Sequence, residues 1–266
     1  MYQDSTGSAA AEAPTTNRDA TTATDNGASD PRSRIAVAAR GLYRHGEPVS
    51  ARHRWPHTGK TLHRNLERRF DAAVDALAAA DGDSSASLQW LQDNDHIVRE
   101  ALSQLDRQLP GAFLRHWPNL TVDGRVEPRI VVLVEELLAV ARFPLAVEQA
   151  ETFLRAYQAK YPLTIGELWA FPALLRAAVL RLLCDSAEAE AAGRPLTVSG
   201  AECIVSLRMA AVTDWADFFE RVNPIDPLLN RDPAAAYAAM DFQTRDRYRQ
   251  AVERLARRTG TDDRQV

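Results

Sequence analysis

Apolar residues recur at helical spacing along most of this chain. Between residues 62 and 77 they are three or four residues apart and share one face of a helix: Leu62, Leu66, Phe70, Val74 and Leu77. The next segment carries a similar stripe from Leu88 to Leu109, and Pro110 follows it. We therefore expect two long amphipathic helices, the second of them continuous up to the proline.

The middle of the chain predicts two further helices. Ile130 to Val134 is a β-branched run that would suit a strand, but the apolar stretch continues to Ala141, beyond the usual length of a strand. We therefore expect a buried helix there. Val147 to Tyr161 has helical spacing as well, and Pro162 ends it.

The helix after Pro162 has a clear beginning. Thr164 and Glu167 stand at the spacing of a capping box, and Leu163 and Leu168 are placed for a hydrophobic staple. Pro172 lies inside the helical pattern that follows, so we expect a kink or a restart of the helix at that point.

The last third of the chain predicts three helices. Gly200 to Val212 forms one, and Asp214 is a suitable cap for a short second one that carries Trp215 and Phe218. Asp241 is expected to cap the last helix. The apolar residues expected to point inward from that helix are Tyr248, Val252 and Leu255.

These patterns contain no dependable strand and no internal repeat, so they predict an all-α fold, a multi-helix bundle or array. Residues 1–33 lack apolar periodicity and are expected to be a disordered, low-complexity tail. Residues 34–60 form a basic, histidine-containing lead-in segment, residues 61–258 the helical domain, and residues 259–266 a flexible tail.

Composition narrows the class of protein. The 266 residues carry a net charge of −4, with 45% hydrophobic and 26% charged residues, as in a globular protein with a sizeable core. Cys184 and Cys203 are the two cysteines, and we expect them to be reduced and buried. The sequence shows no signal peptide and no apolar run of the ~20 residues that cross a bilayer, which favours a cytoplasmic location.

Asp93, Asn94 and Asp95 spell the D-x-D pattern with which sugar-nucleotide transferases hold a divalent cation. Inside a continuous helix, however, side chains two positions apart diverge by about 200°, so we interpret the match as accidental. The helical spacing places Asp95 on the apolar stripe. We expect this carboxylate to lie at an edge position and to pair with an arginine.

Other candidate chemistry is weaker. The four histidines between residues 45 and 63 do not have zinc-site spacing: His45, His53, His57 and His63. Gly59-Lys60-Thr61 ends like a phosphate-binding loop, but Arg54 replaces the required upstream glycine. The sequence therefore predicts no catalytic residue, no metal site and no cofactor. The arginines between residues 32 and 69 suit an anionic surface or an acidic partner, whereas the acidic net charge disfavours nucleic acid.

Two longer segments are more specific than these short patterns. The first is YQAKYPLTIGELWAFPALLR, residues 157–176, and the second is YAAMDFQTRDRYRQAVERLAR, residues 237–257. With SLQWLQDNDHIVREAL, residues 87–102, and LPGAFLRHWPNL, residues 109–120, they resemble the cytoplasmic N-terminal region of bacterial cyclic β-1,2-glucan synthases, in the same order. Asp95 departs from this resemblance, because the family usually has an aromatic residue at that position.

The resemblance implies structural or docking roles rather than catalytic ones. Those enzymes build a cyclic glucan from UDP-glucose, and their membrane, transferase and phosphorylase-like domains are expected after the second signature, where this sequence ends. The positions that carry the resemblance are Trp90, Asp93, Asn94, His96, Tyr157, Gln158, Glu167, Trp169, Asp241, Phe242, Arg245, Asp246 and Arg249. The aromatic residues are expected to fill the core, and Arg245, Asp246 and Arg249 to form a surface ion-pair network or an interface.

Two hypotheses of function follow. The first is a non-catalytic helical module of the cyclic glucan synthase type, truncated, split or regulatory, which acts with the membrane and transferase parts of such an enzyme and reaches the inner membrane through them. The second is a stand-alone binding module for a glucan, an anionic membrane surface or a partner protein, motivated by the tryptophans and the basic segment.

Overall fold

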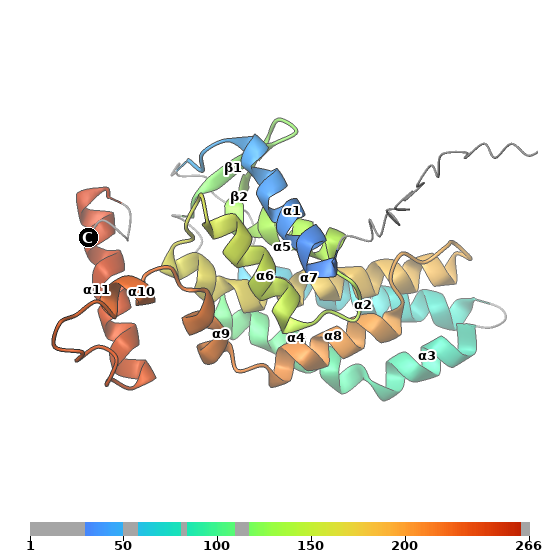
Figure 1. The fold of residues 1–266 in the computed structure, drawn as a ribbon. Helices are drawn as coiled ribbons and strands as arrows, with labels where there is room; N and C mark the ends of the chain where they lie inside the picture. The colour runs from blue at the N-terminus through green and yellow to red at the C-terminus, as the bar shows by residue number, and fades with distance from the viewer. Residues whose placement is uncertain (1–29, 50–57, 81–83, 110–116, 262–266) are drawn as a thin grey trace, which may run out of the picture.

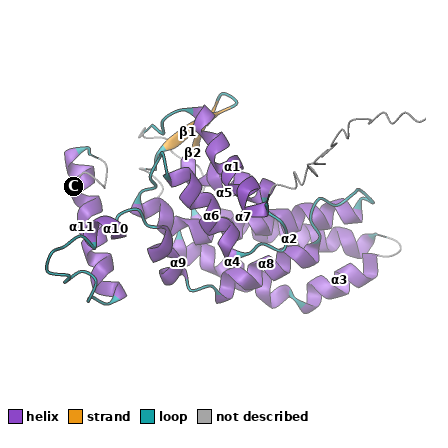
Figure 2. Ribbon diagram, in the orientation of Figure 1, coloured by secondary structure: helices purple, strands orange, loops and turns teal. Residues whose placement is uncertain are grey.

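The computed structural model describes residues 30–49, 58–80, 84–109 and 117–261, and this part of the chain is almost entirely helical (Figures 1 and 2). The helices are α1 (Pro31–Gly41), the short 3-10 helix η1 (Leu42–His45), α2 (Gly59–Ala79), α3 (Ser84–Asp93), α4 (Asp95–Gln108), α5 (Arg129–Val140), α6 (Val147–Gln158), α7 (Ile165–Ala191), α8 (Gly200–Val212), α9 (Trp215–Val222), α10 (Asp226–Leu229) and α11 (Phe242–Thr259). The predicted all-α class is confirmed.

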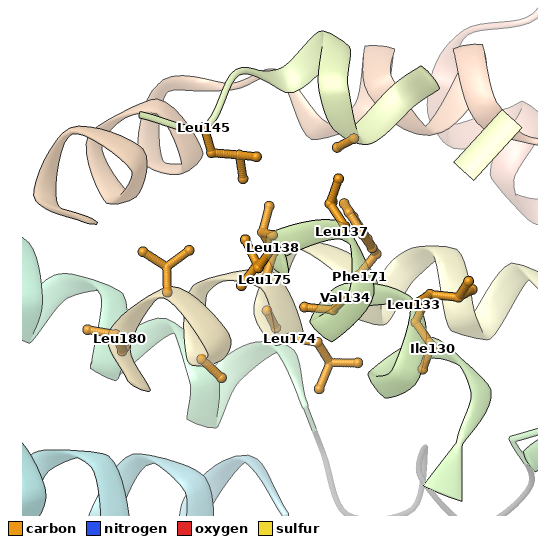
Figure 3. Packing of buried hydrophobic residues seen from close by; sticks show 14 of the residues in the cluster. Ile130, Leu133, Val134, Leu137, Leu138, Leu145, Phe171, Leu174, Leu175 and Leu180 are labelled. Atoms are coloured by element: carbon orange, nitrogen blue, oxygen red, sulfur yellow. The ribbon is translucent and has the colours of Figure 1, made fainter. Parts of the chain in front are cut away.

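Helix α7 is the centre of the bundle. Eighteen of its 27 residues are buried, so it is apolar on nearly every side, as expected of a helix surrounded by others. It packs against α2, α4, α5 and α8. Figure 3 shows side chains of α5, among them Leu137 and Leu138, meeting Phe171 and Leu175 of α7. The helix predicted for residues 130–141 is thus confirmed.

Helix starts agree closely with the predicted caps. In α7, Thr164 and Glu167 form the expected capping box, and Ser199 and Glu202 form a second one at the start of α8. Asp214 and Asp241 accept backbone hydrogen bonds at the starts of α9 and α11. Helix α7 continues through Pro172, so the predicted restart is wrong.

The helix predicted from residue 88 to residue 109 is divided in two. Asn94 interrupts it, so that α3 ends at Asp93 and α4 begins at Asp95. The Asn94 amide nitrogen donates to the Trp90 carbonyl oxygen (2.8 Å), and its side-chain oxygen accepts from Arg208 of α8 (2.6 Å). The contact with α8 is made between distant segments, so spacing along the sequence does not reveal it.

A small antiparallel hairpin contradicts the prediction that the chain has no strand. It consists of β1 (Asn119–Val122) and β2 (Arg125–Pro128), with Leu120 opposite Glu127. Asp123 and Gly124, both with positive φ, make the two-residue turn. Asp-Gly is a strong signal for such a turn, and here it joins strands of only four residues.

Helix α1 was not predicted from the sequence. It begins at Pro31, inside the segment expected to be a disordered tail, and residues 1–29 lie outside the described part of the chain. Asp30 caps the helix, and Ile35 and Ala39 are buried where it packs against α5 and α6. A helix with two buried residues has a short apolar stripe, which is easily missed.

The inward face of α11 also differs from the prediction. Tyr248 and Leu255 are each 49% exposed, whereas Arg249 is 0% exposed and Ala256 is buried. Helices α10 and α11 lie at one end of the molecule, beside α9 (Figure 1). In the described residues no helix is both long and apolar enough to span a bilayer. Cys184 and Cys203 are free and buried, as expected.

Candidate functional site

The two signature segments, far apart in the sequence, meet through aromatic side chains. The ring of Trp169 on α7 stacks on Phe219 of α9, with centroids 4.7 Å apart and planes 26° from parallel. Phe242, at the start of α11, meets Trp169 edge-on with centroids 6.0 Å apart. Both Trp169 and Phe242 are half-buried and pack against the main core. These contacts connect α11 to the bundle.

Arg249 lies beneath this aromatic cluster and is not part of a surface network, which corrects the expectation from the sequence. Its guanidinium lies 5.1 Å from the ring centroid of Phe219 and 5.3 Å from that of Phe242. Its Nε and Nη2 donate to the two carboxylate oxygens of Asp226 (2.7 and 2.6 Å). Tyr237 donates to the same carboxylate (2.8 Å).

The charge of Arg249 is retained despite its burial. Burial by itself lowers the pKa of a guanidinium, but the hydrogen bonds with Asp226 outweigh this effect and the pKa is raised. Glu220 adds a further contact, since it accepts from both Arg249 and Arg245 at 3.1 Å. Asp226 therefore joins α11 to α10, and Glu220 joins it to α9.

A second buried ion pair lies at the start of α7. Nε of Arg129, on α5, donates to Oε1 of Glu167 (2.8 Å), and its Nη2 donates to Oε2. Glu167 is 0% exposed and also accepts from the backbone N–H of Thr164 (2.9 Å). Burial lowers the pKa of Arg129, and the Glu167 charge more than compensates, so that pKa is raised.

Tyr157 and Gln158 hold neighbouring helices in place. The ring of Tyr157 is buried 5.9 Å from the Arg129 guanidinium, and burial raises the pKa of its phenol to about 12. Gln158 donates to the Val222 carbonyl oxygen (2.8 Å) and accepts from the backbone N–H of Leu163 (3.2 Å). Tyr157 thus connects α6 to α5, and Gln158 connects α6 to the end of α9 and to the segment before α7.

The remaining signature positions lie elsewhere. Trp90, Asp93, Asn94 and His96 surround the junction of α3 and α4, and Asp93 and His96 are exposed there. Asp95 pairs with Arg99 (3.2 Å), which confirms the predicted arginine partner. No group of three or more metal-ligating side chains occurs among the described residues.

The other short patterns have structural explanations where they are described. Gly59 to Thr61 form the first turn of α2, and the Thr61 hydroxyl belongs to a capping box with Thr58. His45 and His63 are half-buried on η1 and α2. His53, His57 and His116 lie outside the described residues.

A groove of about 370 Å³ opens beside the aromatic cluster. Four helices line it: the end of α4, the first half of α7, α9 and α11. Its aromatic wall includes Trp169 and Trp215, and its polar side chains are Arg107, Gln108, Asp246 and Gln250. Gln250 donates to Oδ2 of Asp246 (2.7 Å), whereas the buried Oδ1 of Asp246 has no hydrogen-bond partner in the described structure. We define this as the aromatic groove.

Sequence reasoning identified parts of the groove but not the groove itself. The two signatures single out Trp169 and Asp246, and Trp215 belongs to the short helix predicted after Asp214. Arg107, Gln108 and Gln250 carried no signal, because exposed polar residues are common on helices. Only the packing of four helices brings these residues together.

Comparison with known proteins supports the resemblance carried by the two signatures. No family model matches the chain. In an alignment 299 positions long, the chain is 27% identical to the cyclic beta-(1,2)-glucan synthase NdvB of Rhizobium meliloti (strain 1021). The alignment covers 80% of this chain and 10% of that protein. The chain is therefore related to one part of a cyclic β-(1,2)-glucan synthase and spans about a tenth of its length.

Proposed function

We propose that this chain is a non-catalytic helical module that supports the synthesis of a β-1,2-glucan by binding to the membrane and transferase parts of a cyclic glucan synthase. The observation that carries the proposal is that charged residues of the two signatures are buried in ion pairs within the fold. Glu167 and Arg249 are both fully buried and engaged in bidentate ion pairs. Charged groups held in this way maintain a fold and are not accessible to a substrate.

The signatures also explain why such a module would be rigid. The Arg129–Glu167 pair joins α5 to α7, and the Arg249–Asp226 pair joins α11 to α10. Removing one member of either pair leaves a buried charge without its partner, which destabilises the fold. A rigid bundle presents a constant surface to a partner, which is the property that a docking or scaffolding module needs.

The proposal places the chain in the cytoplasm, at the inner membrane when its partner is present. It is tested by complementation. A cyclic glucan synthase from which the corresponding segment has been deleted is co-expressed with this chain, and the chain is isolated by an affinity tag. We expect the remaining enzyme to co-purify and glucan synthesis to increase above that of the deleted enzyme alone.

A folding-deficient variant of this chain is the control. It should neither co-purify with the remaining enzyme nor increase glucan synthesis. Separately, the purified chain is incubated with radiolabelled UDP-glucose and Mg²⁺ or Mn²⁺. Transfer of label to a glucan by the chain alone would refute the non-catalytic role. Failure to co-purify with the remaining enzyme would refute the docking role.

A second candidate function is association with an anionic surface. It is supported by arginines on the outer side of α1 and η1, since Arg32, Arg34, Arg40 and Arg44 are all exposed. Each basic residue near an anionic leaflet contributes about 1 kcal/mol to binding. Sedimentation with vesicles of anionic lipid tests this function. The variant in which these four arginines are replaced by glutamine should remain in the supernatant, and equal sedimentation of both proteins would exclude it.

A further inference from the structure

Helix α11 carries an apolar stripe that the rest of the described structure leaves half uncovered. Tyr248, Val252 and Leu255 are four and three residues apart and therefore share one face of the helix. Val252 is half-buried against the bundle, whereas Tyr248 and Leu255 are each 49% exposed. The Tyr248 ring meets Tyr237 edge-on, with centroids 6.2 Å apart, so it is held in place while much of it faces water. The inward face of α11 is centred instead on Arg249.

A row of arginines runs along one edge of this stripe. Arg247, Arg254 and Arg258 are seven and four residues apart, so they share a face of α11. Ala251, four residues after Arg247 and four before Leu255, lies between the row and the stripe. All three arginines are exposed, and none forms an ion pair or a hydrogen bond with another described residue. The row therefore presents three guanidinium groups that are free to receive carboxylates.

These two features together select the kind of partner. An apolar stripe with spacings of four and three residues is complementary to the stripe of a second amphipathic helix. The arginine row requires carboxylates along one edge of that helix, since guanidinium groups pair bidentately with carboxylates. A second copy of the same face would bring arginines but no row of carboxylates. A bilayer would attract the arginines, but among the described residues of α11 only Tyr248 and Leu255 are large, apolar and exposed enough to enter it.

From this combination we infer that the outer face of α11 docks an acidic amphipathic helix of a partner protein. Apolar side chains of that helix pack on Tyr248 and Leu255, and its carboxylates pair with the three arginines of the row. The inference rests on the proposed function only for the origin of this helix, which is then the membrane and transferase parts of a cyclic glucan synthase. The outer face is defined by Arg247, Tyr248, Ala251, Arg254, Leu255 and Arg258.

The first experiment uses the full chain and a synthetic helical peptide as the probe. The peptide has leucine at the first and fourth positions of each heptad and glutamate beside this stripe, and it carries a fluorescent dye. Binding is measured by fluorescence anisotropy in low salt and in about 1 M NaCl, in which exposed ion pairs are screened. We expect binding to weaken about tenfold in high salt. Hydrogen exchange should show that the bound peptide protects residues 242–259.

Two triple variants with the same change of charge form a matched pair. Each replaces three exposed arginines by glutamine, which keeps a high helix propensity. The first changes the row on α11, and the second changes three positions on α1: Arg32, Arg34 and Arg40. We expect the α11 variant to bind the peptide about tenfold more weakly and the α1 variant to bind as the unaltered chain does. Circular dichroism of both variants verifies that their helices remain folded.

The apolar half of the outer face has a test of its own. The double variant Tyr248→Ala and Leu255→Ala should bind the peptide at least tenfold more weakly, and this loss should be the same in low and high salt, because apolar contacts are not screened. A loss that disappears in high salt would contradict the apolar contact.

Face and module are tested separately. Absence of peptide binding, equal binding by the two triple variants, or protection of helices other than α11 would overturn the inference. Sedimentation with anionic vesicles that only the α11 variant loses would assign the face to a bilayer, and self-association that only the double variant loses would assign it to a second copy. Each result would overturn the inference as well.

The co-purification assay then separates the inference from the proposed function. The α11 triple variant should no longer isolate the remaining synthase, whereas the α1 triple variant should. Retention of the synthase by the α11 variant would refute the inference and leave the docking role intact. Failure of the unaltered chain to isolate the synthase, with peptide binding through α11 retained, would instead refute the proposed function.

Discussion

At the scale of single residues, the chain uses the same motif in two different ways. Thr164–Glu167 and Ser199–Glu202 are both capping boxes, and each glutamate accepts from the backbone N–H of its cap residue at 2.9 Å. Glu202 is half-buried, and the hydrogen bonds from Ser199 lower the pKa of its carboxyl. Glu167 is fully buried and carries the additional bond with Arg129. The difference between the two glutamates isolates the contribution of the buried ion pair.

Replacing these two glutamates measures that contribution. Glu202→Ala removes one side of a cap and should lower the free energy of unfolding by about 0.3–1.5 kcal/mol. Glu167→Ala also leaves the Arg129 guanidinium buried without its partner, and should cost about 3–5 kcal/mol. Urea denaturation followed by circular dichroism gives both values. Equal losses would mean that the ion pair contributes nothing beyond the cap.

The two thiols allow a second test at this scale. Burial raises the pKa of both Cys184 and Cys203 to about 12, compared with about 8.5 for a free cysteine. At pH 8 the native thiols are therefore protonated, and the reactive form is the thiolate. We expect Ellman's reagent to label neither cysteine in the native protein at pH 8 and both in 6 M guanidinium chloride. Rapid labelling of the native protein would contradict their burial.

At the scale of elements, two glycines begin helices in contrasting surroundings. Gly59 begins α2 where it crosses the end of α4, and a Cβ added there would lie 2.3 Å from the Leu105 carbonyl oxygen and 2.8 Å from that of Leu109. Gly200 begins α8, and a Cβ there would meet only the ends of two leucine side chains, at 3.6 and 3.9 Å. Neither glycine has a positive φ. The close approach of α2 to α4 thus depends on Gly59.

Alanine at each position tests the packing of the two helices. Gly59→Ala should force α2 away from α4 and cost about 1–3 kcal/mol, because a backbone carbonyl cannot move aside as a side chain can. Gly200→Ala should leave stability unchanged or increase it by up to about 1 kcal/mol, because alanine restricts the unfolded chain. Thermal denaturation of the two variants measures both changes in stability. A stable Gly59→Ala protein would mean that the two helices are farther apart.

At the scale of the whole molecule, α11 lies at one end of the bundle (Figure 1). Among its contacts are the Phe242–Trp169 ring pair, the Arg249–Asp226 ion pair and the contacts of Arg245 and Arg249 with Glu220. Helix α7, in contrast, is surrounded by four other helices. The aromatic groove lies between α11 and this central helix, so the position of α11 determines whether the groove exists.

Hydrogen exchange measures how firmly α11 is held. Phe242→Ala removes the ring that meets Trp169, and we expect amide exchange in residues 242–259 to become roughly tenfold faster or more. Exchange in α7 should not change, because its core contacts are elsewhere. Leu255→Ala, on the exposed side of α11, is the control and should have no effect. Faster exchange throughout the bundle would mean that α11 and the bundle unfold together.

Most of the helices can be predicted from the sequence, because their causes are local. Spacing of apolar residues placed α2, α5, α6 and α8, and polar caps such as Thr164, Asp214 and Asp241 marked where helices begin. The two signatures also carry the resemblance to cyclic β-1,2-glucan synthases that the comparison supports. These features depend on neighbours within a few residues, so they can be read before any fold is known.

Features that depend on residues far away in the sequence appear only in the folded chain. The break at Asn94 involves Arg208 on α8, and the burial of Arg249 depends on Asp226, 23 residues away. From the sequence, Tyr248 is expected in the core and Arg249 in a surface network or an interface, whereas in the structure Arg249 is buried and Tyr248 is 49% exposed. A charge is buried only where its partner has been folded beside it, and no local pattern carries that information.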